Sequence, residues 1–377
     1  MDLGWTPSEQ AFRAEVRAWL EANVPQVPLP SGDSAEGFAL HVAWEKKLFA
    51  ERLSVVSWPE EYGGRGASLM EWLIFEEEYY RAGAPNRVTQ NGIFLLAPTL
   101  FEYGTDAQKT RILPRMAAAE ELWAQAWSEP GAGSDLAGVS AKARKVETGW
   151  RLSGQKTWCT RASFCTHVFG LFRSDPEAQR HRGLTYFMVP LDVEGVTVRG
   201  FGRLDGDEGF AEIFFDDAFV PHEAIIGAEN QGWKVAMTTA SSERGLTLRS
   251  PGRFLATASR LVDLHRARGA EAPAALRDRV AQAHIEAQAY RIATFGVATK
   301  IADGVSLGAE SSLNKLFWSE MDVRTHETAL DLLGDDALVD NHWTKGFQFA
   351  LAGPIYAGTN EIQRNVVARR LLGLPRG

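Results

Sequence analysis

The feature that most constrains the fold of this 377-residue chain is a change in its hydrophobic pattern. Between about Leu122 and Gly227, short runs rich in β-branched and aromatic residues are divided by Gly, Pro and Asp. Such spacing predicts an antiparallel sandwich or barrel rather than alternating strands and helices. On both sides of this stretch, apolar residues recur with helical spacing. We therefore expect an N-terminal all-α domain at 1–121, a middle antiparallel β domain at 122–228 and a C-terminal four-helix bundle at 229–377.

Two capping boxes predict where helices of the first part begin. Thr6-Pro7-Ser8-Glu9 combines a hydroxyl cap, a proline at the first helical position and a glutamate three residues after the cap. Ser68-Leu69-Met70-Glu71 repeats the hydroxyl and the glutamate, and predicts a helix that continues to about Ala82. Further helices are expected at Phe38–Arg52, Gly92–Tyr103, Gly232–His265, Ala274–Asp303, Leu307–Leu333 and Asn360–Leu372.

Charge and composition exclude several classes of protein. The net charge is −8 and no basic run is present, which argues against a nucleic-acid partner. Two cysteines, Cys159 and Cys165, are too few for a disulfide framework, and the eight histidines lack metal-ligand spacing. Met1–Leu20 has no apolar signal region, and no apolar run reaches the ~18 residues that span a bilayer. The expectation is a cytoplasmic protein without a bound metal and without a membrane segment.

The most specific motif lies within Trp123–Gly138, where the sequence Ser128-Glu129-Pro130-Gly131-Ala132-Gly133-Ser134-Asp135 stands. Taken alone, this stretch predicts a glycine-rich turn after a strand. It lacks the third glycine and the following helix of a dinucleotide-binding fingerprint. It also lacks the Gly-Lys-Ser/Thr of a P-loop.

This stretch closely resembles the first signature of the acyl-CoA dehydrogenase family. Other stretches resemble further parts of that family in the same order along the chain: Trp58–Gly64, Gly104–Lys109 with Leu113-Pro114, Gly154–Thr160 and Tyr356–Arg364. Five collinear matches cover nearly the whole chain and are more specific than any one of them. The family's fold has the same helical, β and helical order that the hydrophobic pattern predicts.

The resemblance implies a bound FAD. Trp127 and Ser128 are expected to reach the flavin through backbone and hydroxyl hydrogen bonds. Trp158 should cover one face of the isoalloxazine ring, and Thr160 should donate toward its N5 atom. The competing interpretation of Trp158 is an ordinary core residue. Metal ligands are not part of this expectation.

Other site residues carried over from the resemblance lie in three places. In the C-terminal signature, Thr359 and Glu361 are expected to contact the cofactor. Ser134 should contact the CoA portion of a thioester substrate. Arg244 and Ala357 are also expected at the substrate.

The family's reaction is an oxidation at a CH–CH bond. A base removes the α-proton of an acyl thioester, a hydride leaves the β-carbon for the flavin, and hydrogen bonds stabilise the developing enolate. Many relatives carry the base, a glutamate, at the position of Ala357, which cannot accept a proton. A minority carry it on the first long helix of the bundle, directly before an arginine. Glu243-Arg244 matches that arrangement, so Glu243 is the expected base; the alternative is a solvated helix carboxylate.

Two departures concern the elements that reach a neighbouring subunit's FAD. Leu264–Gly269 lacks the family's Arg…Phe-Gly element, and Asp331–Asp336 stands where a Gln and two Gly are usual. The three carboxylates Asp331, Asp335 and Asp336 would repel a pyrophosphate. A homo- or hetero-oligomer is expected, and these departures favour an α2β2 assembly with a paralogue.

The partners implied are an acyl-CoA substrate and electron-transfer flavoprotein or a similar acceptor. Degradation of fatty acids or sterol side chains fits the family, and the small residues Ala240, Ser241 and Ser242 hint at room for a bulky acyl group. Two alternatives remain open. One is a flavin oxidase or monooxygenase on the same fold, and the other is a non-catalytic partner subunit of a heteromeric acyl-CoA dehydrogenase.

Overall fold

The chain divides into two compact units, each assembled from separate stretches of sequence. The computed structural model describes residues 4–244, 250–269, 273–305 and 308–375, without the side chains of 242–244. What we call the helical unit comprises Met1–Gln26, Ala67–Ala84 and Arg244–Gly377. What we call the sheet unit comprises Val27–Gly66 and Pro85–Glu243. The two units are described in turn.

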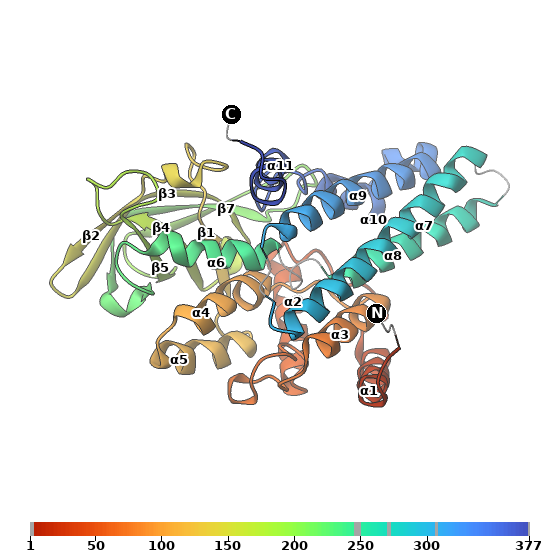
Figure 1. Ribbon diagram of the computed structural model, residues 1–377, viewed down its shortest axis with the longest axis horizontal. Helices are drawn as coiled ribbons and strands as arrows, with labels where there is room; N and C mark the ends of the chain where they lie inside the picture. Colours follow the sequence, from red (N-terminus) through yellow and green to blue (C-terminus); the bar gives the residue numbers. More distant parts are fainter. Residues whose placement is uncertain (1–3, 245–249, 270–272, 306–307, 376–377) are drawn as a thin grey trace. The chain divides into compact units, whose positions relative to one another are not determined.

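The sheet unit is built around one eight-stranded sheet, drawn in yellow and green in Figure 1. Its strands are β1 (Trp123–Ala126), β2 (Lys142–Val146), β3 (Gly149–Thr160), β4 (His167–Arg173), β5 (Leu184–Pro190), β6 (Val196–Phe201), β7 (Phe210–Pro221) and β8 (Ile225–Ile226). The strands follow the order β6-β7-β3-β2-β4-β5-β8, with β1 beside β4. The predicted middle β part is confirmed. Two pairings differ from the antiparallel expectation. Strands β1 and β4 run parallel from Trp123↔His167 to Ala126↔Gly170, and β2 meets β4 in parallel at Lys142↔Arg173.

Strand β3 carries an irregularity that matters for the site. Its pairing with β7 shifts register between Lys156 and Cys159. Trp158, inside this shift, has a φ of 59°, the left-handed conformation that bulky residues rarely adopt. The side-chain alternation of a regular strand is therefore broken at this point.

Helices of the sheet unit are α2 (Ala35–Ala50), α4 (Ala97–Tyr103), α5 (Asp106–Ala117) and α6 (Gly232–Arg244), which ends at the unit boundary. The helix expected at Gly92–Tyr103 begins as a π-helical segment, η2 (Asn91–Leu96), and continues as α4. Pro98 at the start of α4 has no N–H to donate, which accounts for the irregular first turns. Gly104 is the C-cap of α4, as expected.

Two hydrogen bonds fix α6 within the sheet unit. The hydroxyl of Thr239 lies 2.7 Å from the hydroxyl of Thr99 and 3.1 Å from that of Tyr186. Thr99 belongs to α4 and Tyr186 to β5, and all three side chains are buried. This hydroxyl cluster ties the helix that ends in Glu243-Arg244 to both the helices and the sheet of its own unit.

The helical unit combines two N-terminal helices with the C-terminal ones. Its elements are α1 (Pro7–Asn23), α3 (Leu69–Arg81), α7 (Pro251–Arg268), α8 (Ala274–Ala302), α9 (Glu310–Leu333), α10 (His342–Ala350) and α11 (Asn360–Val366). The α1 helix packs on α3, α3 packs on α7, and α7, α8 and α9 pack on one another. Both predicted capping boxes, at Thr6 and at Ser68, are confirmed. Among the described helices, none is long and apolar enough to cross a membrane.

The single helix predicted at Gly232–His265 is wrong. Ser250 has an extended backbone, with ψ at 134°, and caps a new helix whose first residue is Pro251. The Ser250 side chain accepts a hydrogen bond from the N–H of Gly252 at 3.1 Å. A serine cap followed by proline is an ordinary helix start, so the local signal was present in the sequence. The prediction for α9 also began too early: Leu307 lies outside the described residues, and α9 starts at Glu310.

Candidate active site

The structure joins the two motifs that carry the expected flavin contacts. Trp127 and Ser128 directly follow β1, and Trp158 and Thr160 lie at the end of β3. The N–H of Thr157 donates to the carbonyl of Ser128 at 2.9 Å. The four predicted residues are thereby brought into one region of the sheet unit.

Trp158 is not a core residue. Its side chain is 60% exposed, although it is one of the larger apolar groups of the chain. The rings of Phe201 and Phe210 meet it edge-on, with centroids 5.2 and 5.5 Å away. These perpendicular contacts orient the indole ring, and its exposure leaves part of its surface available for another flat ring. A strained backbone that holds an exposed aromatic ring in place is typical of a ligand-binding position.

The environment of Trp127 and Thr160 also fits a polar cofactor. The indole N–H of Trp127 is buried and has no hydrogen-bond acceptor among the described residues. Thr160 is half-buried and is followed by Arg161, another left-handed residue, with φ at 57°. Arg161 donates to a carboxylate oxygen of Asp33 at 2.6 Å, which fixes the turn after Thr160. The residues present therefore fit a flavin, with a flat aromatic surface and unused polar groups around it.

The loop after Ser128 is open where the CoA portion was expected. Ser134 is exposed. A Cβ atom added at Gly131 or Gly133 would meet nothing within 4 Å. The neighbouring Asp135 forms an exposed ion pair with Arg180 at 2.6 Å. The loop thus presents backbone and a hydroxyl rather than a closed pocket.

An ion pair between the two motifs was missed by the sequence analysis. Lys156 is completely buried, and its ammonium lies 2.8 Å from a carboxylate oxygen of Glu129. Burial lowers the pKa of Lys156, and the charge of Glu129 opposes that shift. Burial alone would raise the pKa of Glu129, but Lys156 and backbone donors outweigh it and hold that pKa below its usual range. The two motifs carry opposite charges, but nothing in the sequence spacing indicated that these two side chains meet.

The expected base lies at the end of α6. Glu243 and Arg244 occupy its last two positions, and their side chains lie outside the described residues. Thr239, one helical turn earlier, belongs to the buried hydroxyl cluster with Thr99 and Tyr186. The backbone that carries Glu243 is therefore anchored close to its end.

The C-terminal signature forms a tight turn in the helical unit. Ala357 and Gly358 are both left-handed, with φ of 58° and 78°. The side-chain amide of Gln363 donates to their two carbonyls at 3.0 and 3.2 Å. Among the described residues, no oxygen accepts a hydrogen bond from the N–H of Ala357. The turn therefore engages its carbonyls and leaves an amide donor unused.

Thr359 and Glu361 organise the helix that follows this turn. Thr359 is the N-cap of α11, and its hydroxyl accepts from the N–H of Ile362 at 3.3 Å. Glu361 is exposed in the first turn. A hydrogen bond from its own backbone N–H, and another from Thr359, hold the pKa of Glu361 below its usual range. The two residues expected at the cofactor are thus adjacent at the start of one helix.

The expected cluster of three repelling carboxylates needs correction. Asp331 is paired with Arg279 of α8. Asp336 is paired with Arg268 of α7 at 2.6 Å, and Arg268 also donates to the carbonyl of Leu333. Two of the three charges are therefore neutralised within the chain, which the sequence spacing could not reveal because the arginines lie on other helices.

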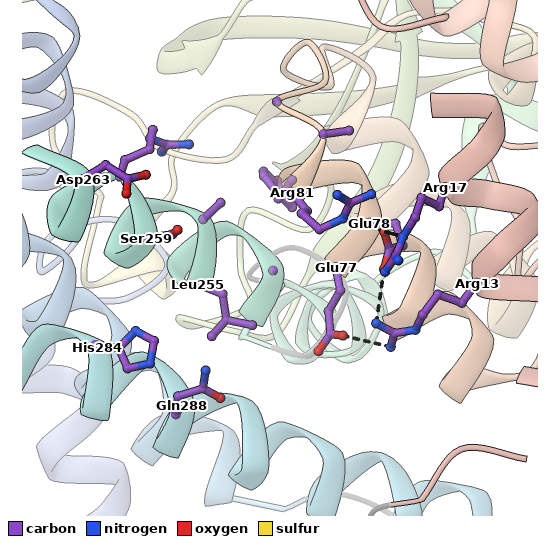
Figure 2. A pocket seen from close by; sticks show the side chains of 16 residues that line it. Arg13, Arg17, Glu77, Glu78, Arg81, Leu255, Ser259, Asp263, His284 and Gln288 are labelled. Atoms are coloured by element: carbon purple, nitrogen blue, oxygen red, sulfur yellow. Dashed lines mark hydrogen bonds and ion pairs between the residues drawn. The ribbon is translucent and has the colours of Figure 1, made fainter. Parts of the chain in front are cut away.

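A pocket of about 590 Å³ opens in the helical unit. Figure 2 shows Arg13 and Arg17 of α1 pointing toward Glu77 and Glu78 of α3, with Leu255 and Ser259 of α7 opposite. Burial alone would raise the pKa of Glu78, but its hydrogen bonds with Arg17 and Arg81 hold that pKa below its usual range. None of the predicted site residues lines this pocket, and its facing charges neutralise one another.

Known proteins resemble this chain over nearly its whole length. Models of the N-terminal, middle and C-terminal domains of acyl-CoA dehydrogenases match residues 6–120, 124–218 and 230–372. Acyl-CoA dehydrogenase IpdE1 from Mycobacterium tuberculosis is 39% identical, over 97% of this chain and 98% of that relative. The protein of the same name from Mycolicibacterium smegmatis is 40% identical, with the same coverage.

Solved structures of the same family have the same fold. A structure named Tcur3481-Tcur3483 steroid ACAD has a TM-score of 0.88 and 26% identity, and all of both chains is covered. The ChsE4-ChsE5 complex from Mycobacterium tuberculosis has a TM-score of 0.84 and 26% identity, again over both chains in full. Its sequence, its domain models and its fold together show that the chain belongs to the acyl-CoA dehydrogenases, a family of FAD-binding oxidoreductases that act on CH–CH groups.

Proposed function

We propose that the protein oxidises the α,β-bond of an acyl-CoA thioester with FAD, and that Glu243 is the base. The observation that carries this proposal is the exposed ring of Trp158, held edge-on by two phenylalanines and joined through Thr157 to Ser128. This arrangement offers a flat surface and nearby polar groups, which are what an isoalloxazine ring requires. Membership of the family supplies the reaction class.

The proposed chemistry gives each of the predicted site residues its own part. A flavin held by Trp127, Ser128, Trp158 and Thr160 would supply the acceptor for the hydride of the β-carbon. The carboxylate of Glu243 takes the α-proton, so that a carbon–carbon double bond forms as the proton and the hydride leave. The N–H of Ala357, which has no acceptor among the described residues, donates to the thioester carbonyl and stabilises the enolate charge. Ser128 and Thr160 orient the flavin, Thr359 and Glu361 contact it from the C-terminal signature, and Ser134 and Arg244 hold the substrate.

The substrate we propose is the CoA thioester of a bulky acid, such as a steroid side chain. Support comes from the steroid acyl-CoA dehydrogenase among the similar structures. The small residues Ala240 and Ser241 lie one turn before the end of α6, and the Ser241 hydroxyl is occupied by the carbonyl of Met237 at 2.9 Å. Small side chains beside the base leave room for a branched or cyclic acyl group.

We also propose that the chain assembles with a paralogue, with an electron-transfer flavoprotein as acceptor. The ChsE4-ChsE5 complex shows that members of this fold form mixed assemblies. The correction at Asp331 and Asp336 removes part of the electrostatic argument, so the missing Arg…Phe-Gly element at Leu264–Gly269 is the remaining one from this chain. One FAD per unlike pair is the expected stoichiometry. A homotetramer of this chain alone with one FAD per subunit and full activity would refute the mixed assembly.

The test of the function is anaerobic reduction of the bound flavin. The protein, purified alone and with a genomically adjacent paralogue, is titrated with steroid-derived, branched and straight-chain acyl-CoA thioesters. We expect the flavin absorbance to bleach with at least one bulky thioester, and an artificial acceptor to restore it. Rapid reduction by NAD(P)H with oxygen consumption, and no reduction by any thioester, would instead identify a monooxygenase.

A further inference from the structure

The ion pair between Lys156 and Glu129 lies inside the two motifs of the sheet unit, and the proposed reaction gives neither residue a role. Lys156 is completely buried and Glu129 nearly so. Burying a charged pair in a protein interior costs free energy unless the remaining donors and acceptors are satisfied. The surroundings of the two groups show what the pair accomplishes.

The ammonium of Lys156 connects three separate segments. It donates to a carboxylate oxygen of Glu129 at 2.8 Å, to the carbonyl of Leu171 at 2.6 Å and to the carbonyl of Trp127 at 3.4 Å. An ammonium has three N–H groups, and each has an acceptor here. Lys156 on β3 therefore holds the residues that follow β1 and the middle of β4 at fixed distances.

The carboxylate of Glu129 fixes the glycine-rich loop in the same way. One oxygen accepts from the N–H of Ala141 at 2.9 Å, and the other accepts from the N–H and the hydroxyl of Ser140 at 2.7 and 2.8 Å. The backbone of Glu129 also exchanges two hydrogen bonds with Ala132, which closes the turn. Hydrogen bonds thus hold both the side chain and the backbone of Glu129, the residue that directly follows Ser128.

The position of Lys156 also explains the direction of Trp158. In a regular strand, residues two apart point to the same face. Here Lys156 is fully buried and Trp158 is 60% exposed, because the register shift begins after Lys156 and the backbone of Trp158 itself is left-handed. Because the buried ammonium is held by three acceptors, Lys156 cannot rotate outward to relieve the bulge. The strained turn is thereby maintained, and the indole ring stays outside the sheet.

We propose that Lys156 and Glu129 are positioning residues, which set the geometry of Ser128 and Trp158 for flavin binding by acting through the loop and the β3 bulge. This inference rests on the proposed function, since it concerns the same flavin site. A merely structural pair would stabilise the fold and leave the affinity of the folded protein for FAD unchanged. The two roles are therefore separable by measuring both quantities on the same variants.

The experiment compares two buried ion pairs of the sheet unit. The double variant Glu129→Gln/Lys156→Met removes both charges and keeps side-chain size. The matched control is Glu45→Gln/Arg87→Met, because Glu45 and Arg87 form a buried pair at 2.7 Å whose hydrogen-bond partners include Ser54 and Val88, which lie outside both motifs. Thermal unfolding, the FAD dissociation constant and the spectrum of bound flavin are measured for each. We expect both doubles to lose thermal stability.

Only the Glu129→Gln/Lys156→Met protein should bind FAD more weakly, by about 10- to 100-fold, the range that lost charged hydrogen bonds predict. Its bound flavin should also show a shifted absorbance spectrum, which a purely structural role would not produce. Equal FAD affinities for the two doubles and the wild type, or equal losses in both doubles, would overturn the inference. A wild-type protein that binds no FAD, alone or with its paralogue, would overturn the proposed function as well.

A milder pair of variants keeps the test decisive if the doubles do not fold. Ser140→Ala removes one exposed hydroxyl that donates to Glu129 at 2.8 Å. Ser153→Ala, on β3 itself, removes a hydroxyl that accepts from the N–H of Asp217 at 3.3 Å and serves as its control. We expect a severalfold higher FAD dissociation constant for Ser140→Ala alone. Identical dissociation constants for the two variants would contradict a positioning role for Glu129.

Discussion

Two motifs of this chain, Gly154–Thr160 (here the sheet signature) and Tyr356–Arg364 (the C-terminal signature), share one backbone feature and use it in opposite ways. Each contains a non-glycine residue in the left-handed conformation, Trp158 with φ at 59° and Ala357 with φ at 58°. At Trp158 the strain holds a large ring out of the sheet, against Phe201 and Phe210. At Ala357 the side chain is a methyl group, and Gln363 engages the carbonyls of the turn.

This difference indicates whether the side chain or the backbone of each residue is functional. The sheet signature presents a side chain, so its function should depend on residue identity at position 158. The C-terminal signature presents a backbone amide, so its function should depend on the shape of the turn around Ala357. Neither of these two residues can accept a proton, which is why the proposed base lies elsewhere, at Glu243.

The largest expected effect tests that division. Glu243→Gln keeps the size of the side chain and removes its proton acceptor. We expect kcat to fall about 10²- to 10⁴-fold while acyl-CoA still binds. Adding Ala357→Glu to this variant places a carboxylate on the other signature and should recover part of the lost rate. The measurements are steady-state kinetics with an artificial acceptor and a binding titration with substrate.

The control for the base is Glu36→Gln, an exposed carboxylate in the first turn of α2. It should leave kcat unchanged. A Glu243→Gln protein with the wild-type turnover number would exclude Glu243 as the base. It would also contradict the proposal that the base lies outside the two signatures.

The second prediction concerns the ring of Trp158. Trp158→Ala should raise the FAD dissociation constant about 10- to 100-fold, from lost aromatic contact and apolar burial. Trp158→Gly loses the same ring but tolerates the left-handed backbone, so its unfolding free energy should exceed that of Trp158→Ala by about 1 kcal/mol. Calorimetry of the apoproteins and FAD titration separate the two quantities. Normal FAD affinity in both variants would show that the sheet signature does not present its side chain to the cofactor.

The third prediction concerns the shape of the C-terminal turn. Gln363→Met removes the amide that donates to the carbonyls of Ala357 and Gly358. Leaving such partners unsatisfied costs about 1–3 kcal/mol, so we expect a loss of stability in that range. Because the turn orients the Ala357 amide, kcat should fall as well, while the FAD dissociation constant should change less than in Trp158→Ala. A Gln363→Met protein with reduced FAD affinity and normal kcat would reverse the roles of the two signatures.

The smallest expected effect is a pH dependence in the sheet unit. Burial, followed by the nearby charge of Arg111, lowers the pKa of His167 from 6.5 to about 4. The folded state thus resists protonation of this ring. The imidazole stacks on the indole of Trp123 in β1, with the two ring centroids 4.6 Å apart. The contribution of neutral His167 to the free energy of unfolding is complete above pH 6.5 and is lost as the pH falls toward 4. Between pH 4 and 6.5, the melting temperature of His167→Gln should depend less on pH than that of the wild type. An equal pH dependence in the two proteins would contradict the lowered pKa of His167.

Much of the fold could be predicted because helix starts are local signals. The cap hydroxyls of Thr6 and Ser68, each with a glutamate three residues later, are both formed in the structure. The same chemistry at Ser250-Pro251 was passed over, because apolar residues continue across it and favour one long helix. The parallel pairing of β1 with β4 depends on strands about forty residues apart, which no local pattern encodes.

The residues of the candidate site are a prediction from the sequence motifs, whereas their geometry comes from the structure alone. The motifs identified Trp127, Ser128 and Trp158 from sequence alone. Strand alternation would place Lys156 and Trp158 on one face, whereas the register shift against β7 buries one and exposes the other. That shift is set by pairing with a distant strand, so the buried ion pair with Glu129 could not be foreseen.

The division of the helical unit into three sequence segments has a consequence for synthesis of the chain. Glu77 of α3 pairs with Arg291 of α8, which is 214 positions later. At translation rates of about 5–20 residues per second, α3 waits ~10–40 s for that partner. Meanwhile every segment of the sheet unit has left the ribosome, since that unit ends at Glu243. The sheet unit can therefore mature during translation, whereas the face of α3 that packs on α7 stays uncovered until the last third of the polypeptide emerges. Nascent chains are exposed to aggregation and to chaperones in that interval.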